Sequence, residues 1–201
     1  VSLNPGFLTL DVRDAQGRLV CSHLPMPVAQ PMGTGEAGWF AAALRSGGFM
    51  ASGVSVGPRT GKRIVALSYP IRDGSGAPTG LVILAVDLLA LNKQLLAEIP
   101  EGALVLVTDA SRALLLRSAE PETYIGRRPA TDDADLAGGR PEGVLLATGL
   151  DGVPRLLAHV TVPGTGWRVF AGLPQAQVMA EYDALVKRAI GIGIGMLLLV
   201  F

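Results

Sequence analysis

The clearest hydrophobic pattern lies in Arg63–Leu91, where two apolar runs flank a polar turn. The runs Ile64–Ile71 and Leu81–Val86 are typical of β-strands, and the turn between them is rich in Gly, Pro and Asp. The second run is apolar at every position, which predicts a strand that is covered on both faces. It is followed by Asp87, a carboxylate that either pairs with another group or caps the next element.

The residues on either side of this hairpin predict further strands and short helices. Leucine spacing in Leu88–Glu98 indicates a helix directly after the second strand. Upstream, Phe7–Val12 and Gly17–Ser22 predict a first hairpin. Between the two hairpins we expect a helix over Trp39–Arg45 and a strand over Phe49–Val56.

The same pattern returns in the second half of the chain. Three segments repeat earlier ones in the same order: Asp109–Leu115 resembles Asp14–Val20, Arg155–Ala158 resembles Arg63–Ala66, and Gly166–Ala171 resembles Gly80–Ala85. Ordered repeats predict two homologous units, although hairpins with Asp-Gly turns also resemble one another without common origin. We therefore expect an α+β protein of two tandem units, each an antiparallel sheet with flanking helices.

This pattern divides the chain into four parts. They are a distal unit over residues 1–91, a linker helix and hinge over 92–102, a proximal unit over 103–173, and a C-terminal segment over 174–201. In the last part, Ala189–Phe201 contains no charged residue. A membrane-spanning helix needs roughly 20 apolar residues, so we expect a stalk and a transmembrane helix that continues beyond Phe201. A buried core helix is the alternative.

The composition agrees with a membrane-associated protein. Of the 201 residues, 49% are hydrophobic and 17% are charged, which is apolar for a soluble domain. The 17 basic and 17 acidic residues balance, so no electrostatic argument supports nucleic-acid binding. The single cysteine, Cys21, excludes a disulfide within the chain. This thiol either pairs with a segment upstream of Val1 or is buried and inert.

No group of residues has the pattern of a catalytic or cofactor site. Gly33–Gly38 has the spacing of a dinucleotide-binding fingerprint, but a proline-rich loop precedes it where that fingerprint needs a strand. We interpret this segment as a glycine-rich entry to a helix. His23 and His159 are far apart in sequence, and neither a metal-ligand cluster nor a nucleophile motif is evident. We therefore expect no enzyme activity, no cofactor and no metal.

The order of these elements, more than any one of them, resembles a known family. Two PAS-like units that lead into a membrane helix are similar to a double Cache domain, an extracytoplasmic sensor of bacterial transmembrane receptors. The likeness covers nearly the whole chain from Phe7 onward. It is carried by DAQGRLVCS (Asp14–Ser22), WFAAAL (Trp39–Leu44), ALSYPI (Ala66–Ile71), GLVILAVDL (Gly80–Leu88) and LDGVPRLLA (Leu150–Ala158).

The resemblance implies a function and a location. Such domains belong to two-component histidine kinases, diguanylate cyclases and chemoreceptors, and their membrane-distal unit usually holds a small-molecule ligand. We therefore expect a signal-transduction receptor in the bacterial inner membrane, forming a homodimer, with its globular part in the periplasm. A membrane helix and a stalk helix normally precede the distal unit, and both would lie upstream of Val1.

The resemblance also implies which residues contact the ligand. In amino-acid-binding members, an Arg two residues before a Trp and a Tyr on the next strand hold the carboxylate, while an Asp at the end of the sheet holds the ammonium group. Here Trp39 and Asp87 match, but Ala37 replaces the Arg and Phe49–Val56 contains no Tyr. This departure favours an amine or a small neutral molecule over a standard amino acid. The candidate ligand-binding residues are Trp39, Phe40, Ser68, Tyr69 and Asp87.

Each candidate also has a structural interpretation. Asp87 is placed to cap the following helix, Trp39 and Phe40 suit a helix core, and Tyr69 suits a half-buried strand position. The alternative function is the same fold without a small-molecule ligand, serving dimerisation or a protein partner. A pocket of roughly 300 Å³ or more, lined by Trp39, Tyr69 and Asp87, would favour ligand binding over that alternative.

Overall fold

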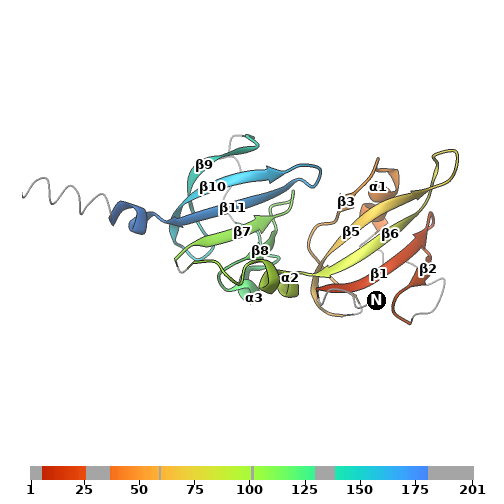
Figure 1. Cartoon of the computed structure of the whole chain (residues 1–201), viewed down its shortest axis with the longest axis horizontal. Coiled ribbons are helices and arrows are strands. Elements are labelled where there is room, and N and C mark those ends of the chain that lie inside the picture. The colour runs from red at the N-terminus through yellow and green to blue at the C-terminus, as the bar shows by residue number, and fades with distance from the viewer. Residues whose placement is uncertain (1–5, 26–36, 59, 101, 130–138, 181–201) are drawn as a thin grey trace, which may run out of the picture.

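The computed structural model describes residues 6–25, 37–58, 60–100, 102–129 and 139–180. Its elements are β1 (Phe7–Asp14), β2 (Leu19–Ser22), α1 (Ala37–Arg45), β3 (Met50–Ala51), β4 (Ser55–Val56), β5 (Arg63–Arg72), β6 (Pro78–Asp87), α2 (Leu88–Leu95), β7 (Leu104–Thr108), β8 (Leu114–Arg117), α3 (Pro121–Tyr124), β9 (Glu142–Thr148), β10 (Pro154–Val162) and β11 (Trp167–Pro174). They form two separate antiparallel sheets, which follow one another along the molecule (Figure 1).

The two sheets share one strand order. The distal sheet has the order β2-β1-β6-β5-β3, with β4 also paired to β5, and the proximal sheet has the order β8-β7-β11-β10-β9. In each unit, the first strand lies between the second and the last, and the last lies beside the next-to-last. The expected α+β class with two antiparallel sheets is confirmed, whereas the residue borders of the four parts stay a prediction.

The long hairpin of β5 and β6 forms as its turn residues predict. Asp73 accepts hydrogen bonds from backbone N–H groups of its own turn, which closes the hairpin. Gly80 is required in β6 because a Cβ atom there would collide with the carbonyl oxygen of Arg13 in β1. A Cβ atom at Gly172 of β11 would likewise collide with the carbonyl oxygen of Leu156 in β10. The central strand of each sheet therefore approaches its neighbour at a glycine.

One predicted strand is interrupted. The strand expected over Phe49–Val56 is split into β3 and β4. Between them, the backbone N–H of Val54 points to the carboxylate of Asp109 in the proximal unit, at 3.4 Å from Oδ2. At Val54 the backbone N–H is directed to the other unit and not to the strand ladder, a long-range contact that the local pattern does not contain.

Two further expectations are corrected. The helix expected to run to Glu98 ends at Leu95, because Leu96 departs from helical geometry while its N–H still bonds to Asn92 O. Cys21 is exposed, so the interpretation as a buried, inert thiol is wrong. Pairing of this thiol with a segment outside the chain stays a prediction.

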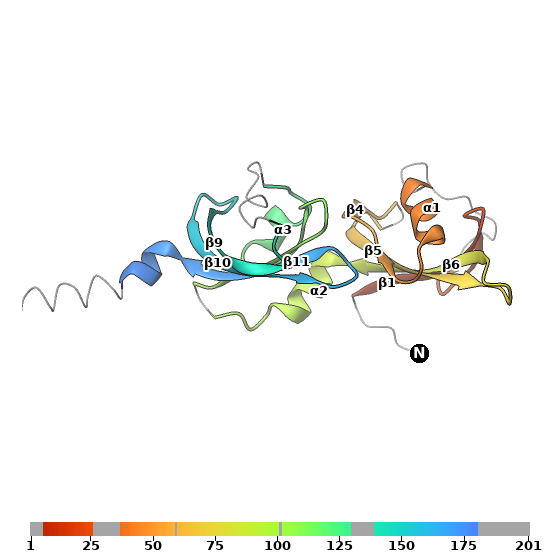
Figure 2. The ribbon, with the colours of Figure 1, turned by 90° about the horizontal axis from the view of Figure 1, so that it is seen from above.

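Helix α1 lies on one face of the distal sheet, and α3 lies on the same side of the proximal sheet (Figure 2). Phe40 and Ala43 of α1 pack on Leu81 and Ile83 of β6, which forms a small core of the distal unit. This arrangement explains the continuous apolar run of β6: one face of the strand meets α1 and the other meets the core between the units.

One hydrophobic cluster joins the two units. Its buried members are Val65, Val86 and Leu88 from the distal side and Val107, Leu115, Leu116 and Ile125 from the proximal side. Two hydrogen bonds reinforce this contact: the backbone N–H of Arg117 donates to Asn92 Oδ1 at 2.7 Å, and Arg63 Nη1 donates to Glu122 O at 2.8 Å. The two units are therefore packed together through a shared core.

The described residues contain no helix that is long and apolar enough to cross a membrane. The expected transmembrane segment, Ala189–Phe201, lies outside the described residues. Most of the glycine-rich segment Gly33–Gly38 also lies outside them, although its last two residues open α1.

Candidate functional site

A small cavity of about 80 Å³ lies in the distal unit. Strands β1, β5 and β6, helix α1 and the loop between β4 and β5 supply its lining: Leu8, Thr9, Asp11, Arg13, Trp39, Gly57, Pro58, Thr60, Ile64, Ala66, Ile83 and Ala85. Among the described residues of this lining, Trp39 is the only one of the five candidate ligand-binding residues. This cavity is smaller than about 300 Å³ and its lining contains neither Tyr69 nor Asp87, so it does not meet the condition that would favour ligand binding over the alternative function.

Three buried polar side chains of β1 line this cavity: Thr9, Asp11 and Arg13. Ser22 Oγ donates to Asp11 Oδ1 at 2.6 Å, and Arg13 Nη1 donates to Gly17 O at 2.7 Å. The strand thus turns its polar face inward, the reverse of an ordinary half-exposed strand. The sequence signal was their alternation with apolar residues, which places all three side chains on one face.

Both aromatic residues of α1 contact the distal core. Phe40 is buried within the cluster on β6 and acts as a core residue, whereas Trp39 lies at the edge of that cluster and lines the cavity. The indole Nε1 of Trp39 is buried without a hydrogen-bond partner among the described residues. Because an unpaired buried donor is unfavourable, this N–H group is a candidate contact for a polar ligand.

Ser68 and Tyr69 point to opposite faces of β5, as consecutive residues of a strand must. Ser68 is buried and its Oγ donates to Met50 O at 3.1 Å. Tyr69 is 59% exposed and lies on the face of the sheet opposite to Ala66, a residue of the cavity lining. The structure therefore does not bring these two residues together at one site.

Asp87 ends β6 and caps α2. Its Oδ1 accepts hydrogen bonds from Leu89 N (3.0 Å) and Ala90 N (3.2 Å), and its Oδ2 accepts one from Lys62 Nζ (2.7 Å). Burial raises the pKa of this carboxyl, but the hydrogen bonds from Lys62 and from the helix outweigh burial and hold the pKa below its ordinary value. The cap interpretation is confirmed, and contact with a ligand stays a prediction.

A larger cavity, of about 400 Å³, lies in the proximal unit. Its volume falls in the range of about 300–1,000 Å³ that is typical of small-molecule sites. Apolar side chains make up half of its lining, which consists of Leu104, Leu106, Thr108, Asp109, Ala110, Arg112, Leu114, Arg117, Pro129, Leu145, Ala147, Thr148, Gly149, Leu150, Arg155, Leu157, Thr161, Gly166, Arg168 and Phe170. No sequence pattern singled out this group as a site.

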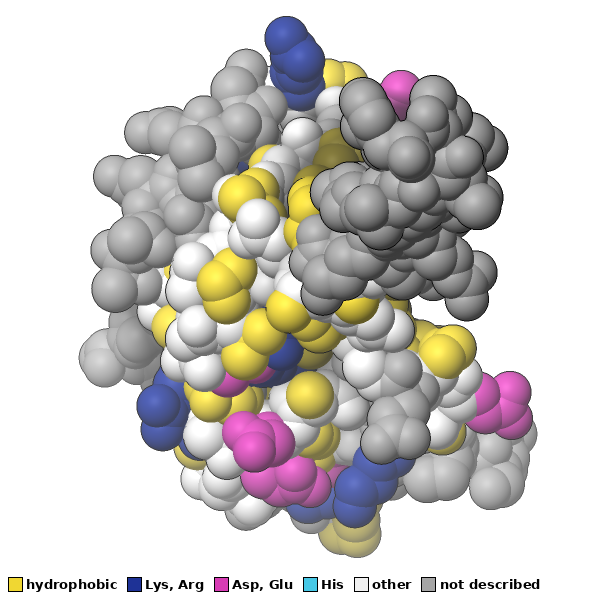
Figure 3. Space-filling view, turned by 90° about the vertical axis from the view of Figure 1, so that its left-hand side faces the viewer, with side chains coloured by type: hydrophobic (Ala, Val, Ile, Leu, Met, Phe, Trp, Pro, Cys, Tyr) yellow, Lys and Arg dark blue, Asp and Glu magenta, His cyan; other side chains and the backbone are white. Residues whose placement is uncertain are grey.

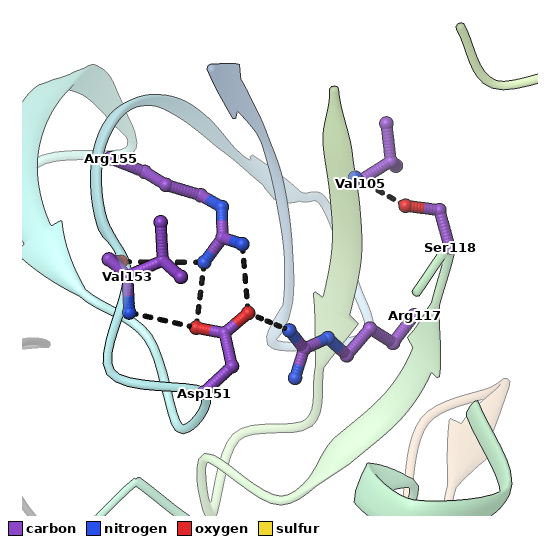
Figure 4. A network of polar contacts seen from close by, with 6 residues as sticks. All are labelled: Val105, Arg117, Ser118, Asp151, Val153 and Arg155. Carbon is purple, nitrogen blue, oxygen red and sulfur yellow. Dashed lines mark hydrogen bonds and ion pairs between the residues drawn. The ribbon is translucent and has the colours of Figure 1, made fainter. Parts of the chain in front are cut away.

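Two buried arginines share one carboxylate at this cavity (Figure 4). Arg155 of β10 donates through Nη1 and Nη2 to the two oxygens of Asp151, at 2.8 and 2.7 Å, which is a bidentate arrangement. Arg117 of β8 donates to Asp151 Oδ2 at 2.6 Å and lies over the ring of Tyr124, with 4.0 Å from its guanidinium carbon to the ring centroid. The hydrogen bonds from Arg155 hold the pKa of Asp151 well below its ordinary value, although burial opposes them.

The family model described as Cache domain matches residues 5–182. The chain belongs to the Cache family. The resemblance to a double Cache sensor that its motifs indicated is thereby confirmed. No curated protein sequence matches this Cache domain.

Solved structures of the same fold come from bacterial receptors. The extracellular domain of the putative histidine kinase rpHK1S-Z16 is 16% identical, with a TM-score of 0.69 over 87% of this Cache domain and 73% of that chain. The ligand-binding domain of the Pseudomonas aeruginosa chemoreceptor PctB, in complex with L-Arg, is 16% identical, with a TM-score of 0.63. The match covers 87% of this Cache domain and 74% of that chain. The ligand-binding domain of the Pseudomonas fluorescens chemoreceptor CtaA, in complex with L-leucine, is 14% identical, with a TM-score of 0.61. The match covers 85% of this Cache domain and 72% of that chain. At these identities the similarity is one of fold.

Proposed function

We propose that this Cache domain is the extracytoplasmic, ligand-sensing domain of a bacterial transmembrane receptor, namely a sensor histidine kinase, a diguanylate cyclase or a chemoreceptor. The observation that carries the proposal is the double Cache fold, since the similar structures are the extracellular domain of a putative histidine kinase and ligand-binding domains of chemoreceptors. The proximal cavity, whose volume of about 400 Å³ is typical of small-molecule sites, is a second support. In this proposal the domain binds a signal molecule, and another part of the receptor performs the output.

In this proposal the distal cavity takes an amine or a small neutral molecule. Asp11 and Trp39 support an amine, because a carboxylate attracts an ammonium group and an indole ring attracts it through a cation–π interaction. The volume of about 80 Å³ favours a ligand smaller than the L-Arg of PctB or the L-leucine of CtaA. Arg13, which lines the same cavity, is a candidate partner for a polar oxygen of a neutral ligand.

A thermal-shift screen of amines, amino acids and carboxylates tests the proposal. A ligand at 100 times its dissociation constant adds about 2.7 kcal/mol to the free energy of unfolding, so we expect a clear rise in melting temperature with at least one compound. For a neutral distal ligand, Trp39→Phe removes the indole N–H as a hydrogen-bond donor and should weaken binding roughly fivefold to tenfold by calorimetry. For an amine, the variant replaces the ring that binds cations best by a weaker one, and binding should also weaken. Tyr69→Phe is the matched control, because that side chain lies on the opposite face; equal losses in both variants would exclude the distal cavity.

Calorimetry of Asp87→Asn decides the role of Asp87. Asparagine caps a helix about as well as aspartate, whereas loss of a buried ammonium partner would weaken binding by at least about 30-fold. Lys62 already pairs with this carboxylate, so we expect the variant to bind the distal ligand as tightly as the wild-type chain. A loss of 30-fold or more would assign Asp87 to the ligand after all.

Exposed apolar residues support the alternative function as a dimerisation or partner module. Val144 and Leu146 of β9, with Leu156 and Val160 of β10, are exposed on the face of the proximal sheet that points away from its cavity. Seen from the proximal end, hydrophobic side chains are scattered in small groups over the described surface (Figure 3). A homodimer would cover such a face, and a screen in which no compound stabilises the domain would favour this function.

A further inference from the structure

The proximal cavity has the size and walls of a site for an organic molecule. Its volume is about 400 Å³, against about 80 Å³ for the distal cavity. Leu106, Leu145, Leu157 and Phe170 are among its apolar walls, and they suit the hydrocarbon part of a ligand. A molecule too large for the distal cavity therefore has room here.

The charges around this cavity favour an anion. Its described lining contains the arginines Arg112, Arg117, Arg155 and Arg168 and one acid, Asp109, an excess of three positive charges. Asp151, which lies against two of these arginines, reduces the excess to two. Because a partly apolar cavity screens charge less than water does, this excess attracts and orients a negatively charged group.

The two buried guanidinium groups also have unused donors. Arg155 offers its Nη1 and Nη2 atoms to Asp151, and Arg117 offers its Nη2 atom. The Nε atoms of both side chains are buried without a hydrogen-bond partner among the described residues. A buried donor that stays unpaired is unfavourable, and a carboxylate is the group that the planar guanidinium fork binds best.

The same arginine touches the contact between the two units. The backbone N–H of Arg117 donates to Asn92 Oδ1 in α2, and Asp109, which also lines the cavity, accepts from the backbone N–H of Val54 in the distal unit. A carboxylate that binds the Arg117 guanidinium would weaken the ion pair between Arg117 and Asp151 and shift β8, which carries Arg117. Occupancy of the proximal cavity can therefore reach the distal unit through contacts already present.

From these observations we infer that the proximal unit binds a small organic carboxylate, held by Arg117 and Arg155, with its apolar part in the cavity. This goes beyond the proposed function, which needs only a ligand in the distal unit. It gives the receptor a second input, for an anion with a hydrophobic body. The distal cavity takes a different chemical class.

The experiment titrates the chain with sodium benzoate and sodium hexanoate by calorimetry, and with benzamide and hexanamide as neutral counterparts. Binding is located by the two indole N–H signals in NMR spectra, since the chain has two tryptophans, Trp39 in the distal unit and Trp167 beside the proximal lining residues Gly166 and Arg168. We expect a carboxylate to bind at least about tenfold more tightly than its amide, because hydrogen bonds to charged groups are the stronger ones. It should shift the Trp167 signal and leave the Trp39 signal in place.

Substitutions then test the arginines. Arg117→Gln keeps Asp151 paired with Arg155 and should weaken carboxylate binding at least about tenfold. Arg18→Gln is the control, because it removes the same charge from an exposed ion pair of the distal unit, and it should leave the affinity unchanged. If Arg117→Gln does not fold, Arg168→Gln replaces it and should weaken binding severalfold through the lost charge.

Several results would overturn the inference: no binding of either carboxylate at millimolar concentration, equal binding of the amides, or unchanged affinity in the arginine variants. A carboxylate that shifts the Trp39 signal alone, and whose binding depends on Trp39, would refute the proximal site while leaving the proposed sensing function intact. Failure of the amine screen together with normal carboxylate binding would leave the proximal site standing and remove the distal one.

Discussion

Replacing Asp151 by asparagine is expected to lower the free energy of unfolding by about 3–5 kcal/mol, because the change leaves two buried guanidinium groups without their carboxylate. The side chain of Arg117 is 2% exposed and that of Arg155 is 10% exposed, so solvation compensates only in part for the lost partner. Asparagine keeps the shape of the side chain and can still accept the hydrogen bond from Val153 N. The expected loss of stability therefore comes from the lost charge. Urea denaturation measures it as the change in the free energy of unfolding.

Asp14→Asn is the matched control for this prediction. Asp14 pairs with Arg18 four residues later, the same spacing as between Asp151 and Arg155, but the Arg18 side chain is exposed. Exposed ion pairs contribute little to stability because water solvates both charges, so this variant should unfold close to the wild-type chain. If the two variants lose stability equally, burial does not determine the strength of the Asp151 network.

The same carboxylate predicts an acid-sensitive stability. The pKa of Asp151 lies well below its ordinary value of 3.8, chiefly because Arg155 donates hydrogen bonds to it. A group whose pKa is lowered on folding stabilises the folded state above its unfolded pKa and loses that contribution as the pH falls toward its folded pKa. Denaturation of the wild-type chain and of Asp151→Asn from about pH 7 to about pH 3 should therefore show their difference shrinking below about pH 4. A difference in stability that stays constant over this pH range would contradict a lowered pKa of Asp151 in the folded state.

Leu115→Ala is expected to destabilise both units, by about 2–5 kcal/mol, because it opens a cavity in the core that they share. Leu115 is 1% exposed and belongs to the cluster that contains Val65 and Leu88 of the distal side. Chains that keep a single tryptophan separate the two responses: Trp39 reports on the distal unit and Trp167 on the proximal unit. In Leu115→Ala, the transitions seen by both tryptophans should move to lower denaturant.

Leu157→Ala removes the same atoms from a cluster that is confined to the proximal unit. In this control the transition reported by Trp39 should move less than in Leu115→Ala. A shift in Leu115→Ala that is seen by Trp167 alone would show that the shared cluster does not couple the units. Coupling of this kind is what a receptor domain needs if binding in one unit is to affect the other.

The hairpins, the repeated units and the cap at Asp87 could be predicted from the sequence because each depends on near neighbours. The residues around Asp73 close a turn through their own side chains and backbone. The carboxylate of Asp87 reaches the N–H groups of the two residues that follow Leu88. Such interactions form wherever the local sequence is the same, which is why the repeated motifs indicated two sheets of one kind.

The inward face of each strand was harder to predict. Alternation places Thr9, Asp11 and Arg13 on one face of β1, but it does not say whether α1 or solvent meets that face. Polar residues ordinarily indicate the solvent side, and here they are buried. For β5 the same alternation places Ser68 and Tyr69 on opposite faces, so two neighbours in one strand could not both line a single pocket.

The proximal cavity and its charges were decided by the tertiary structure alone. Arg117, Asp151 and Arg155 come from β8, from the turn before β10 and from β10, and strands β7 and β11 lie between β8 and β10 in the sheet. In the sequence these are ordinary charged residues at strand ends, which are mostly exposed in proteins. Whether such a charge can be buried depends on a partner that long-range packing brings to it, and neither propensity nor periodicity carries that information.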